Sequence, residues 1–421
     1  MTEARAAGAA TDHRGRPRVA VTGMGVKSPA GLTLDELWDG LLAARSAAAP
    51  VTLFDASAHS VGFACEVRGF DPVAYVGPKE VRRTDRAALL GVAAAADAIA
   101  QATEAAPFGV DPVRCGVVAG SGIGGIRTLE DQVIGYAEKG PGKVGPFLVP
   151  MMMANATAAL VGIRNGFTGP NTAVATACAT GANAIGDGAR LVRDGMADVV
   201  VCGGTEACLT PVTVAAFARM GALSKHPEPA LASRPFDDDR DGFVMGEGAA
   251  FVVLEPYEQA VARGATVLGE VAGYGMTCDA HHITAPVEDG SGAAAAIEMA
   301  LADAGLAPSA IGHVNAHGTS TPHNDSAEAA AIAKVFGPGA VPVTSIKGVT
   351  GHLIGAAGAV EAVAALLSIE RGVVPPTANH ERTDLPVDVV AGEPRTIGPS
   401  PAVSTSFAFG GHNVALVLAP A

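Results

Sequence analysis

A cysteine and two histidines stand in local sequences that could carry out thioester chemistry. Cys178 lies among small residues in Thr-Ala-Cys-Ala-Thr-Gly, directly before a predicted helix. The positive end of a helix dipole favours a thiolate at such a position, and small neighbours leave room for a substrate carbonyl to approach the sulfur. This pattern is typical of a nucleophile held between a strand and a helix, although a packed small residue at a tight turn has the same local sequence.

His317 follows a predicted strand in Asn-Ala-His-Gly-Thr, and His352 lies at the start of a helix rich in glycine and alanine. A nucleophilic cysteine needs nearby groups that move a proton or polarise a carbonyl. Each histidine alone could be structural. Because reactive groups gather at the carboxyl ends of strands in α/β folds, one cysteine and two histidines in strand-to-helix turns favour a shared site.

The elements that would position these residues alternate between valine-rich and alanine-rich runs. Uninterrupted valine runs predict strands that are covered on both faces, and the alternating order predicts a layered α/β fold. The predicted helices are 85–101 and 181–195, and the predicted strands are 18–23, 115–120, 197–202, 249–254 and 413–418.

A weak internal repeat indicates two similar α/β halves. Residues 19–25 resemble residues 270–276, and each segment is followed by an alanine-rich helix and then by a strand that runs into glycine and small polar residues. Each half also ends on a strand, at 249–254 and 413–418. We therefore predict two related halves joined near residues 255–266, with chance similarity of glycine-rich turns as the alternative.

The composition excludes several classes of protein. The chain has 421 residues, of which 49% are hydrophobic and 17% charged, which suffices for one large domain or two to three smaller ones and excludes a disordered protein. With 28 basic and 42 acidic residues the net charge is −14, which disfavours nucleic-acid binding. Six cysteines without CxxC spacing predict neither a zinc site nor a disulfide framework, but free thiols in the cytoplasm.

Two segments bear on targeting. Residues 1–17 mix acids and bases without an apolar run, which predicts a disordered, solvated tail rather than a signal peptide. Residues 145–163 carry no charge, but prolines and polar residues interrupt them. They therefore predict a buried helix or a subunit interface rather than a membrane span, and we expect no membrane association.

Four motifs in order resemble those of the β-ketoacyl-[acyl-carrier-protein] synthases, at spacings typical of that family. They are residues 176–181, 315–322, 347–358 and 406–413. The similarity is closest to the discrete synthase II enzymes of fatty-acid synthesis and the discrete ketosynthases of type II polyketide pathways, and it covers residues 19–418. The resemblance implies a thiolase-like α/β fold with duplicated βαβαβαββ halves over 18–260 and 261–421, five α-β-α-β-α layers and a dimer.

The resemblance also implies a decarboxylative Claisen condensation. Cys178 would accept an acyl group from an acyl-carrier protein, and His317 and His352 would polarise the malonyl thioester as it loses CO₂. Lys347 and Glu361 match a supporting pair that orders the two histidines. The enolate carbon would then attack the acyl group on the cysteine, so the chain would be an acyltransferase.

Further residues match the family's binding and gating positions. The backbone N–H groups of Cys178 and Phe409 would form an oxyanion hole, and Phe407 and Phe409 would lie in a gating loop. The residues expected along the pantetheine and acyl path are Thr319, Thr321, Gly410, Gly411, Met151 and Met152. For the two methionines, core packing is the alternative.

The partner that the resemblance implies is an acidic acyl-carrier protein, which brings the 4′-phosphopantetheine arm. A basic patch on this acidic chain would bind it, and the candidates are Lys79, Arg82, Arg83 and Arg219. The alternative for the first three is an ordinary solvated helix start. No metal and no further cofactor is expected. The second subunit would be an identical chain or one that resembles a chain-length factor.

Four residues depart from the synthase II pattern and leave substrate choice open. His412 stands where threonine is usual, His323 and Asn324 replace a smaller pair, and Ala408 replaces a glycine between two phenylalanines. The pathway, fatty-acid or polyketide, and the chain length therefore stay open. One alternative is a non-catalytic chain-length-factor-like subunit, which the cysteine and both histidines disfavour. The other is a thiolase or a thioester hydrolase. The lack of any cysteine after Cys278 disfavours a thiolase, and a hydrolase would yield a free acid instead of a β-ketoacyl product.

Overall fold

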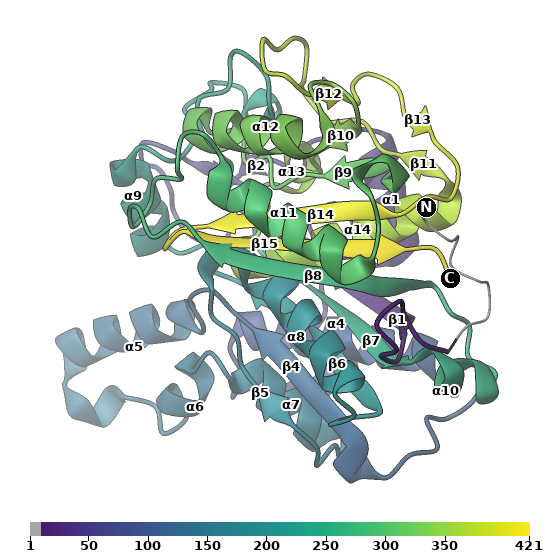
Figure 1. Ribbon diagram of the computed structural model, residues 1–421. Helices are drawn as coiled ribbons and strands as arrows, with labels where there is room; N and C mark the ends of the chain where they lie inside the picture. Colours follow the sequence, from purple (N-terminus) through teal and green to yellow (C-terminus); the bar gives the residue numbers. More distant parts are fainter. Residues whose placement is uncertain (1–9) are drawn as a thin grey trace.

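A mixed sheet of eleven strands runs through the computed structural model, which describes residues 10–421 (Figure 1). Its strands are β1 (Val19–Lys27), β4 (Cys115–Gly120), β5 (Asn171–Thr172), β6 (Val199–Glu206), β7 (Gly248–Pro256), β8 (Gly269–Cys278), β9 (His313–Asn315), β10 (Pro342–Thr344), β12 (Asp388–Val389), β14 (Ala402–Ala408) and β15 (His412–Ala419). Two small sheets pair β2 (Ala49–Pro50) with β3 (Phe63–Ala64), and β11 (Val373–Val374) with β13 (Arg395–Thr396). The order across the large sheet is β12-β10-β9-β14-β15-β8-β1-β7-β6-β4-β5.

Two halves of this sheet repeat one topology. In both β5-β4-β6-β7-β1 and β10-β9-β14-β15-β8, the strands of the half stand in the order third, second, fourth, fifth, first. In each half the first three of these strands are parallel, and the last two are antiparallel to their neighbours. The halves join where β1 pairs with β8 through Ala20 and Val21. The predicted duplication is therefore confirmed.

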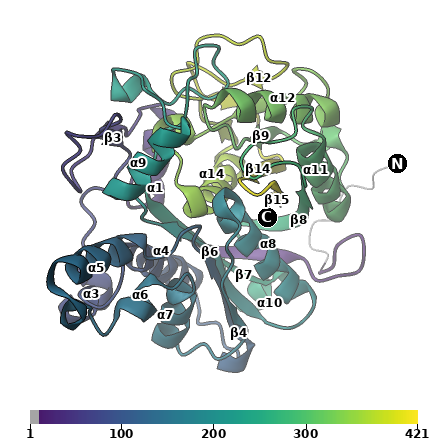
Figure 2. The same cartoon turned by 90° about the vertical axis from the view of Figure 1, so that its left-hand side faces the viewer.

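Helices complete the βαβαβαββ pattern of each half. They are α1 (Leu34–Leu42), α2 (Val73–Val76), α3 (Pro78–Val81), α4 (Arg86–Ala102), α5 (Ile126–Lys139), α6 (Leu148–Met152), α7 (Ala156–Asn165), α8 (Thr180–Arg193), α9 (Pro211–Met220), α10 (Tyr257–Ala262), α11 (Ser291–Ala304), α12 (Pro322–Phe336), α13 (Lys347–Thr350) and α14 (Ala357–Arg371). α8 and α14 pack against each other between the two half-sheets, while α4 and α7 cover one outer face and α11 and α12 the other (Figure 2). The predicted five-layered fold is confirmed, and each predicted segment overlaps an element of the predicted type.

The internal repeat in the sequence has a packing cause. Gly23 and Gly25 of β1 lie under α4, and a Cβ added at Gly23 would be 2.0 Å from the backbone oxygen of Ala98. Gly273 of β8 lies under α11 in the same way, since its Cβ would be 2.2 Å from the backbone oxygen of Ala300. Only glycine lets a helix lie this close to its sheet, so the first strand of each half carries the same Gly-x-Gly pattern.

The predicted disordered tail can be compared with the structure only over residues 10–17. Residues 1–9 lie outside the described part of the chain, but the rest of the tail forms a turn against the end of α11. Asp12 accepts hydrogen bonds from the backbone N–H groups of Arg14 and Arg16, and both guanidiniums form ion pairs with Asp303. The prediction does not hold for this turn, because its charges are paired with the domain rather than solvated.

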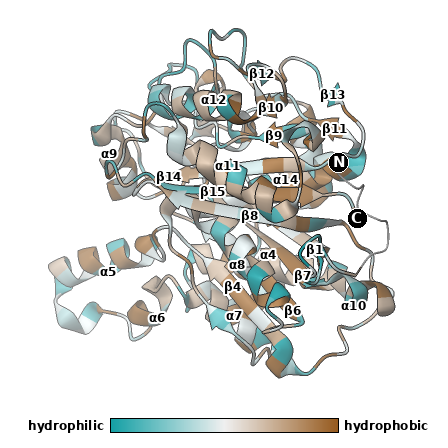
Figure 3. Ribbon diagram, viewed as in Figure 1, coloured by the Kyte–Doolittle hydropathy of each residue, from teal (hydrophilic) through white to brown (hydrophobic). Residues whose placement is uncertain are grey.

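The uncharged segment 145–163 forms α6 and much of α7, and this chain does not bury it fully. Val149 and Ile163 are 61% and 76% exposed. Apolar residues recur along α5 and α6, which project from the body of the molecule (Figure 3). This chain therefore buries the segment only in part, through residues of α7 such as Ala158 and Val161, while a subunit interface stays a prediction. No helix within residues 10–421 is long and apolar enough to cross a membrane.

His313, the first residue of β9, is a buried titratable group. Neither of its ring nitrogens has a hydrogen-bond partner among the described residues, and burial lowers the pKa of its imidazole from 6.5 to about 4. In the unfolded chain the same group takes up a proton below about pH 6.5, so acid favours unfolding. The stability that the neutral imidazole contributes is present above this pH and is lost as the pH falls toward 4.

We predict that His313→Leu makes the protein less sensitive to acid. Between pH 8 and pH 5 the wild-type chain should lose about 2 kcal/mol more unfolding free energy than the variant, because the variant has no such proton to bind when it unfolds. Urea denaturation at both pH values measures this difference. A variant that loses as much stability as the wild type would contradict the prediction.

Candidate active site

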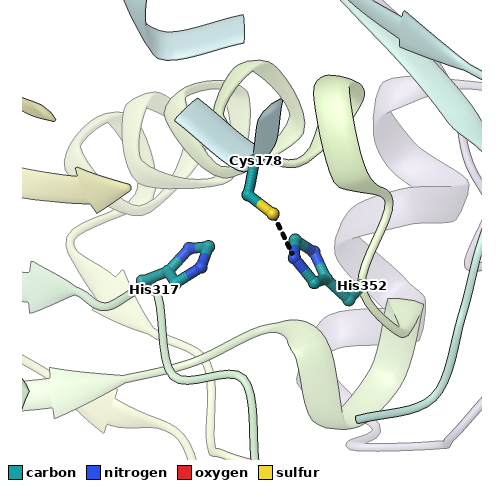
Figure 4. A group of neighbouring side chains, drawn as sticks. All are labelled: Cys178, His317 and His352. Atoms are coloured by element: carbon teal, nitrogen blue, oxygen red, sulfur yellow. Dashed lines mark hydrogen bonds between the residues drawn. The ribbon is translucent and has the colours of Figure 1, made fainter. Parts of the chain in front are cut away.

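Cys178, His317 and His352 meet at the start of the central helix layer (Figure 4). The sulfur and a ring nitrogen of each histidine lie within 4.8 Å of one another, and His352 Nε2 is 3.0 Å from Cys178 Sγ. The two imidazole rings meet edge to face, with centroids 5.3 Å apart. All three side chains are buried and line a cavity of about 510 Å³. The structure thus brings together the three residues that sequence reasoning selected.

Cys178 and His352 lie in equivalent connections of the two halves. Cys178 is held in a short turn before α8, and His352 lies in the loop that leads into a similar turn before α14. The first residues of these turns, Ala177 and Ile354, both have a left-handed backbone with φ of 48°. This conformation is strained for alanine and more so for β-branched isoleucine, and such strain clusters at functional sites.

Glycines let the two central helices approach closely beside the site. A Cβ at Gly181 in α8 would lie 2.6 Å from the backbone nitrogen of Ala359, and one at Gly358 in α14 would lie 2.8 Å from that of Ala182. The start of one helix is thereby held against the start of the other. This contact is the physical reason for the small residues that follow Cys178 and His352 in the sequence.

The Cys178 thiol is protonated at neutral pH. Burial raises its pKa to about 12, and the Lys347 ammonium and the backbone N–H of Phe409 offset only part of this rise. The expectation of a resting thiolate is therefore wrong, because removal of the charge from water outweighs the helix dipole.

Both histidines are neutral and present an N–H to the cavity. Burial lowers the pKa of each imidazole well below its usual value, and the Lys347 ammonium adds to this effect. His317 Nδ1 lies 3.2 Å from the ammonium, and His352 Nδ1 accepts from the backbone N–H of Ile354 at 3.3 Å. Because Nδ1 accepts a hydrogen bond on both rings, each ring carries its proton on Nε2. The two imidazoles therefore act as hydrogen-bond donors.

Lys347 and Glu361 support His317 from behind. Both side chains are 1% exposed and form an ion pair with each other. Lys347 Nζ also donates to the backbone oxygen of His317 at 2.5 Å. Burial raises the pKa of the Glu361 carboxyl, and the lysine charge opposes this rise. An ammonium can only donate, so this pair fixes the tautomer of His317.

Phe407 and Phe409 flank the reactive centre and line the cavity. The Phe407 ring lies edge-on to the His317 ring, with centroids 6.1 Å apart. The backbone N–H of Phe409 lies close enough to the sulfur of Cys178 to lower the pKa of the thiol. An N–H group in this place is also suited to bind an oxyanion that forms on a thioester carbonyl at the sulfur.

The residues expected along the pantetheine arm lie near the cavity. Thr319, Thr321 and Gly411 line it, and the two threonine hydroxyls are 2.8 Å apart. Gly410 does not line it but donates its N–H to the backbone oxygen of Ile283 at 2.7 Å. This bond ties the loop of Phe407 and Phe409 to the segment after β8, which also borders the cavity.

The structure does not place Met151 and Met152 on this cavity. They belong to α6, where the backbone oxygen of Met152 accepts the N–H of Gly125. The apolar wall is formed instead by residues that sequence reasoning missed, among them Ile123 and Phe243. The Phe243 ring packs edge-on to His352, with centroids 5.2 Å apart.

The positions that depart from the synthase II pattern lie near the cavity. His323 and Asn324, in the first turn of α12, line it. His412 lies beside Gly410, since a Cβ at that glycine would be 3.1 Å from the His412 ring. These side chains are therefore placed to influence which substrates enter.

The candidate docking residues are all exposed. Lys79, Arg82 and Arg83 lie on and just after α3, and Arg219 lies near the end of α9. The next residue, Met220, lines the cavity. α3 and α9 lie on the same side of the molecule (Figure 2).

Sequence reasoning missed two buried carboxylates behind His317. Glu328 accepts the backbone N–H groups of His317 and Gly318 at 2.8 and 2.7 Å, and the hydroxyl of Thr405 at 2.7 Å. Asp325, one turn earlier in α12, also accepts backbone N–H groups. Burial raises the pKa of Glu328 to about 7. The i, i+3 spacing of two acids just after a candidate histidine is the signal that could have found them.

The Cys-His-His cluster has the residue types of a metal site, but its hydrogen bonding does not fit a cation. A metal would need lone pairs from the sulfur and from one nitrogen of each ring. Here Nε2 carries the proton on both rings, and the Lys347 ammonium lies beside His317. The arrangement is suited to stabilise negative charge instead.

The duplicated α/β halves and the buried Cys-His-His site define a thiolase-like ketosynthase. Residues 16–260 match the N-terminal domain of the beta-ketoacyl synthases, and residues 268–381 match the C-terminal domain. The chain therefore belongs to the β-ketoacyl synthase family, as its motifs indicated.

Known proteins resemble the chain over nearly its whole length. The 3-oxoacyl-[acyl-carrier-protein] synthase 2 of Synechocystis sp. is 48% identical over 407 residues, which cover 95% of this chain and 97% of the relative. The solved ishigamide ketosynthase/chain length factor has a TM-score of 0.89 at 37% identity, over 96% of this chain and 100% of that one. A type II polyketide ketosynthase solved with its acyl-carrier protein, and bound to a hexaketide, has a TM-score of 0.88 at 29% identity and the same coverage.

Proposed function

We propose that the chain condenses an acyl group with a malonyl group that an acyl-carrier protein delivers, and releases CO₂. The observation that carries this proposal is a buried thiol 3.0 Å from an imidazole, in a cavity where two imidazoles present N–H donors. Condensation needs this combination, because negative charge develops on the sulfur and on a thioester oxygen. The product is a β-ketoacyl-acyl-carrier protein.

In the first half-reaction Cys178 takes over the acyl group. Its sulfur attacks the thioester carbonyl, the bond to the pantetheine sulfur breaks, and the thiol proton ends on the departing pantetheine thiol. The backbone N–H groups of Cys178 and Phe409 stabilise the carbonyl oxyanion. The Nε2–H of His352 stabilises the charge that develops on the Cys178 sulfur.

In the second half-reaction the malonyl thioester loses CO₂. The electrons of the broken C–C bond form an enolate, whose oxygen accepts hydrogen bonds from Nε2–H of His317 and of His352. The enolate carbon attacks the acyl carbonyl, a new C–C bond forms, and Cys178 leaves as a thiolate that takes up one proton. Lys347 and Glu361 keep His317 in its donating tautomer.

These steps need no metal and no resident cofactor, since the carrier brings its own 4′-phosphopantetheine thioester. Carriers of fatty-acid and of polyketide synthesis present the same thioester chemistry, so the proposal names the acyl thioester as the substrate class. All six cysteines, which lie within the described residues, are free thiols, as the reducing cytoplasm favours. A non-catalytic chain-length-factor role is disfavoured, because this chain holds its nucleophile and both histidines at reacting distance.

We propose that the carrier docks on the side of the molecule that holds α3 and α9. Lys79, Arg82 and Arg83 form an exposed basic group there, and Arg219 adds a charge next to a cavity residue. The whole chain has a charge of −14, so local positive charge is needed to attract an acidic partner. The Arg83 guanidinium lies 4.7 Å above the ring of Phe147, so the proposed docking surface would adjoin the arm of α5 and α6.

We further propose that two identical chains pair through this arm and the adjacent sheet edge. Val133, Tyr136, Val149 and Ile163 are each more than half exposed. β5 ends the large sheet, and both of its residues are exposed, which leaves a free edge for a second chain. A partner that resembles a chain-length factor would cover the same surface and is the alternative.

The reaction is tested by incubating the chain with two forms of the carrier protein, one loaded with an acyl group and one loaded with a malonyl group. The wild-type chain should gain the acyl mass on the Cys178 peptide and then release CO₂ and a β-ketoacyl product, because the sulfur is the group that carries the acyl chain. Cys178→Ala should lose the adduct and at least about 1,000-fold in product formation. Comparison of the rates with carriers that bear saturated acyl groups and carriers that bear polyketide acyl groups defines which acyl group the chain prefers. Product formation by Cys178→Ala at the wild-type rate would refute the mechanism.

Charge reversal tests the docking surface. The double variant Arg82→Glu, Arg83→Glu should raise KM for a carrier-bound substrate about tenfold or more, but leave KM for a short pantetheine thioester unchanged, because only the carrier meets this surface. Arg382→Glu, which reverses an arginine that is 71% exposed, is the matched control. Equal effects on both substrates would show that these arginines do not bind the carrier.

Light scattering tests the pairing. The purified chain should give twice its 41.8 kDa mass, and Val149→Asp should shift it toward 41.8 kDa, since a buried carboxylate in an apolar interface is unfavourable. Val261→Asp is the control, because Val261 is 53% exposed on α10 instead of the arm. A monomeric wild-type chain would contradict the identical pair and favour a partner of different sequence.

A further inference from the structure

Glu206, the last residue of β6, binds two loops of the active site at once. Its Oε1 accepts the hydroxyl of Ser121 at 2.9 Å, and its Oε2 accepts the backbone N–H groups of Gly122 and Gly355 at 2.8 and 3.1 Å. Gly122 lines the cavity, and Gly355 follows His352 by three residues. The Glu206 side chain is fully buried, so a single carboxylate joins both loops out of contact with water.

This junction requires glycine on both sides. A Cβ at Gly122 would lie 2.8 Å from Glu206 Oε2. A Cβ at Gly355 would lie 2.8 Å from the same oxygen and 2.3 Å from the backbone nitrogen of Gly122. Burial raises the pKa of the Glu206 carboxyl to about 7, and the hydrogen bonds it accepts lower it. The group is therefore mostly ionised at pH 8.

The residue before Gly355 is strained. Ile354 has a φ of 48°, which a β-branched residue rarely adopts. Its N–H is the one that donates to His352 Nδ1 and so keeps the ring proton on Nε2. A strained residue keeps its conformation only where its surroundings hold it. The hydrogen bond from Gly355 to Glu206 holds the next peptide in the chain.

We propose that Glu206 is a positioning residue that acts through His352. By holding Gly355 it keeps Ile354 left-handed, and Ile354 in turn keeps Nε2–H of His352 directed at the sulfur of Cys178. Glu206 itself touches no substrate. The inference rests on the donor role proposed above for His352. Its test needs neither a carrier protein nor condensation, so the two proposals can fail separately.

Alkylation of Cys178 by iodoacetamide at pH 8 tests this role, because its rate follows the thiolate fraction. His352→Ala should slow it about tenfold, since one hydrogen bond to a thiolate shifts the thiol pKa by about one unit. Glu206→Ala should slow it by the same factor when compared with Glu206→Gln, because both variants remove the Glu206 charge that raises the pKa of Cys178. The double variant of His352→Ala and Glu206→Ala should be no slower than either single variant. Mass spectrometry of the Cys178 peptide gives the rate, and the exposed thiol of Cys278 reports the reagent in each sample.

Further variants separate positioning from general damage. Glu206→Gln keeps a carbonyl for the two N–H groups and should stay within about threefold of the wild-type rate. Ser121→Ala removes the hydroxyl that donates to Glu206 and accepts the backbone N–H of Gly124, and should alkylate like the wild type. Glu66→Ala should do so too, although it removes a buried carboxylate that accepts the backbone N–H groups of Thr52 and Leu53. If Glu206→Ala fails to fold, Glu206→Asp, which is too short to reach both loops, should slow alkylation equally.

Four results would overturn the proposal. About a hundredfold loss in the double variant would show two independent effects. Equal alkylation rates in folded Glu206→Ala and Glu206→Gln proteins would show that the hydrogen bonds accepted by this side chain do not position His352. A tenfold loss in Ser121→Ala or Glu66→Ala would show an unspecific effect. Alkylation of His352→Ala at the wild-type rate would show that the His352 N–H does not stabilise the thiolate, so Glu206 could not act through it.

Discussion

The hydrogen bond that each of the two buried histidines accepts on Nδ1 is the constraint on which this site depends. The Lys347 ammonium serves His317, and the backbone N–H of Ile354 serves His352. Both rings are buried and neutral, so the single proton of each ring is forced onto Nε2, toward the cavity. If either ring took the other tautomer, a lone pair would face the developing enolate and repel it. The supporting residues therefore determine the chemistry as much as the imidazoles do.

The duplicated fold explains how these groups come together. Cys178 precedes α8 in the first half, and His352 precedes α14 in the second, at matching points of one repeated topology. Because α8 and α14 touch through Gly181 and Gly358, the two connections are brought side by side. The left-handed residues also match, since Ala177 and Ile354 each open the short turn before their helix. A site that spans two halves thus follows from packing equivalent helices against each other.

Much of this arrangement could be predicted from the sequence, because it depends on patterns among residues that are close together in the chain. Valine runs and alanine-rich runs mark the strands and helices, and the Gly-x-Gly repeat marks the two positions where a helix lies directly on a sheet. Cys178, His317 and His352 lie in turns that can be recognised in the sequence by the small residues around them. What could not be predicted depends on residues brought in from distant segments. Glu206 and Glu328 meet backbone N–H groups that only the folded chain presents.

The same limit explains the wrong expectations. A thiol at a helix start suggests a thiolate, but the sequence does not show that burial raises the pKa of Cys178 to about 12. Likewise, Met151 and Met152 have the composition of an acyl tunnel, yet α6 carries them away from the cavity of this chain. Burial and the direction of a projecting helix are properties of tertiary structure, and neither leaves a periodic trace in the sequence.

A protonated thiol among N–H donors favours synthesis over hydrolysis. At rest the Cys178 sulfur carries no charge, so no thiolate stands ready to take a proton from water. Charge appears only when a thioester carbonyl arrives, and it then meets the N–H groups of Phe409, His317 and His352. Once the acyl group sits on Cys178, no ionised base is present among these groups to activate a water molecule against it. The carbon nucleophile from malonyl is therefore generated at the acyl carbonyl by the same donors, without a competing hydroxide.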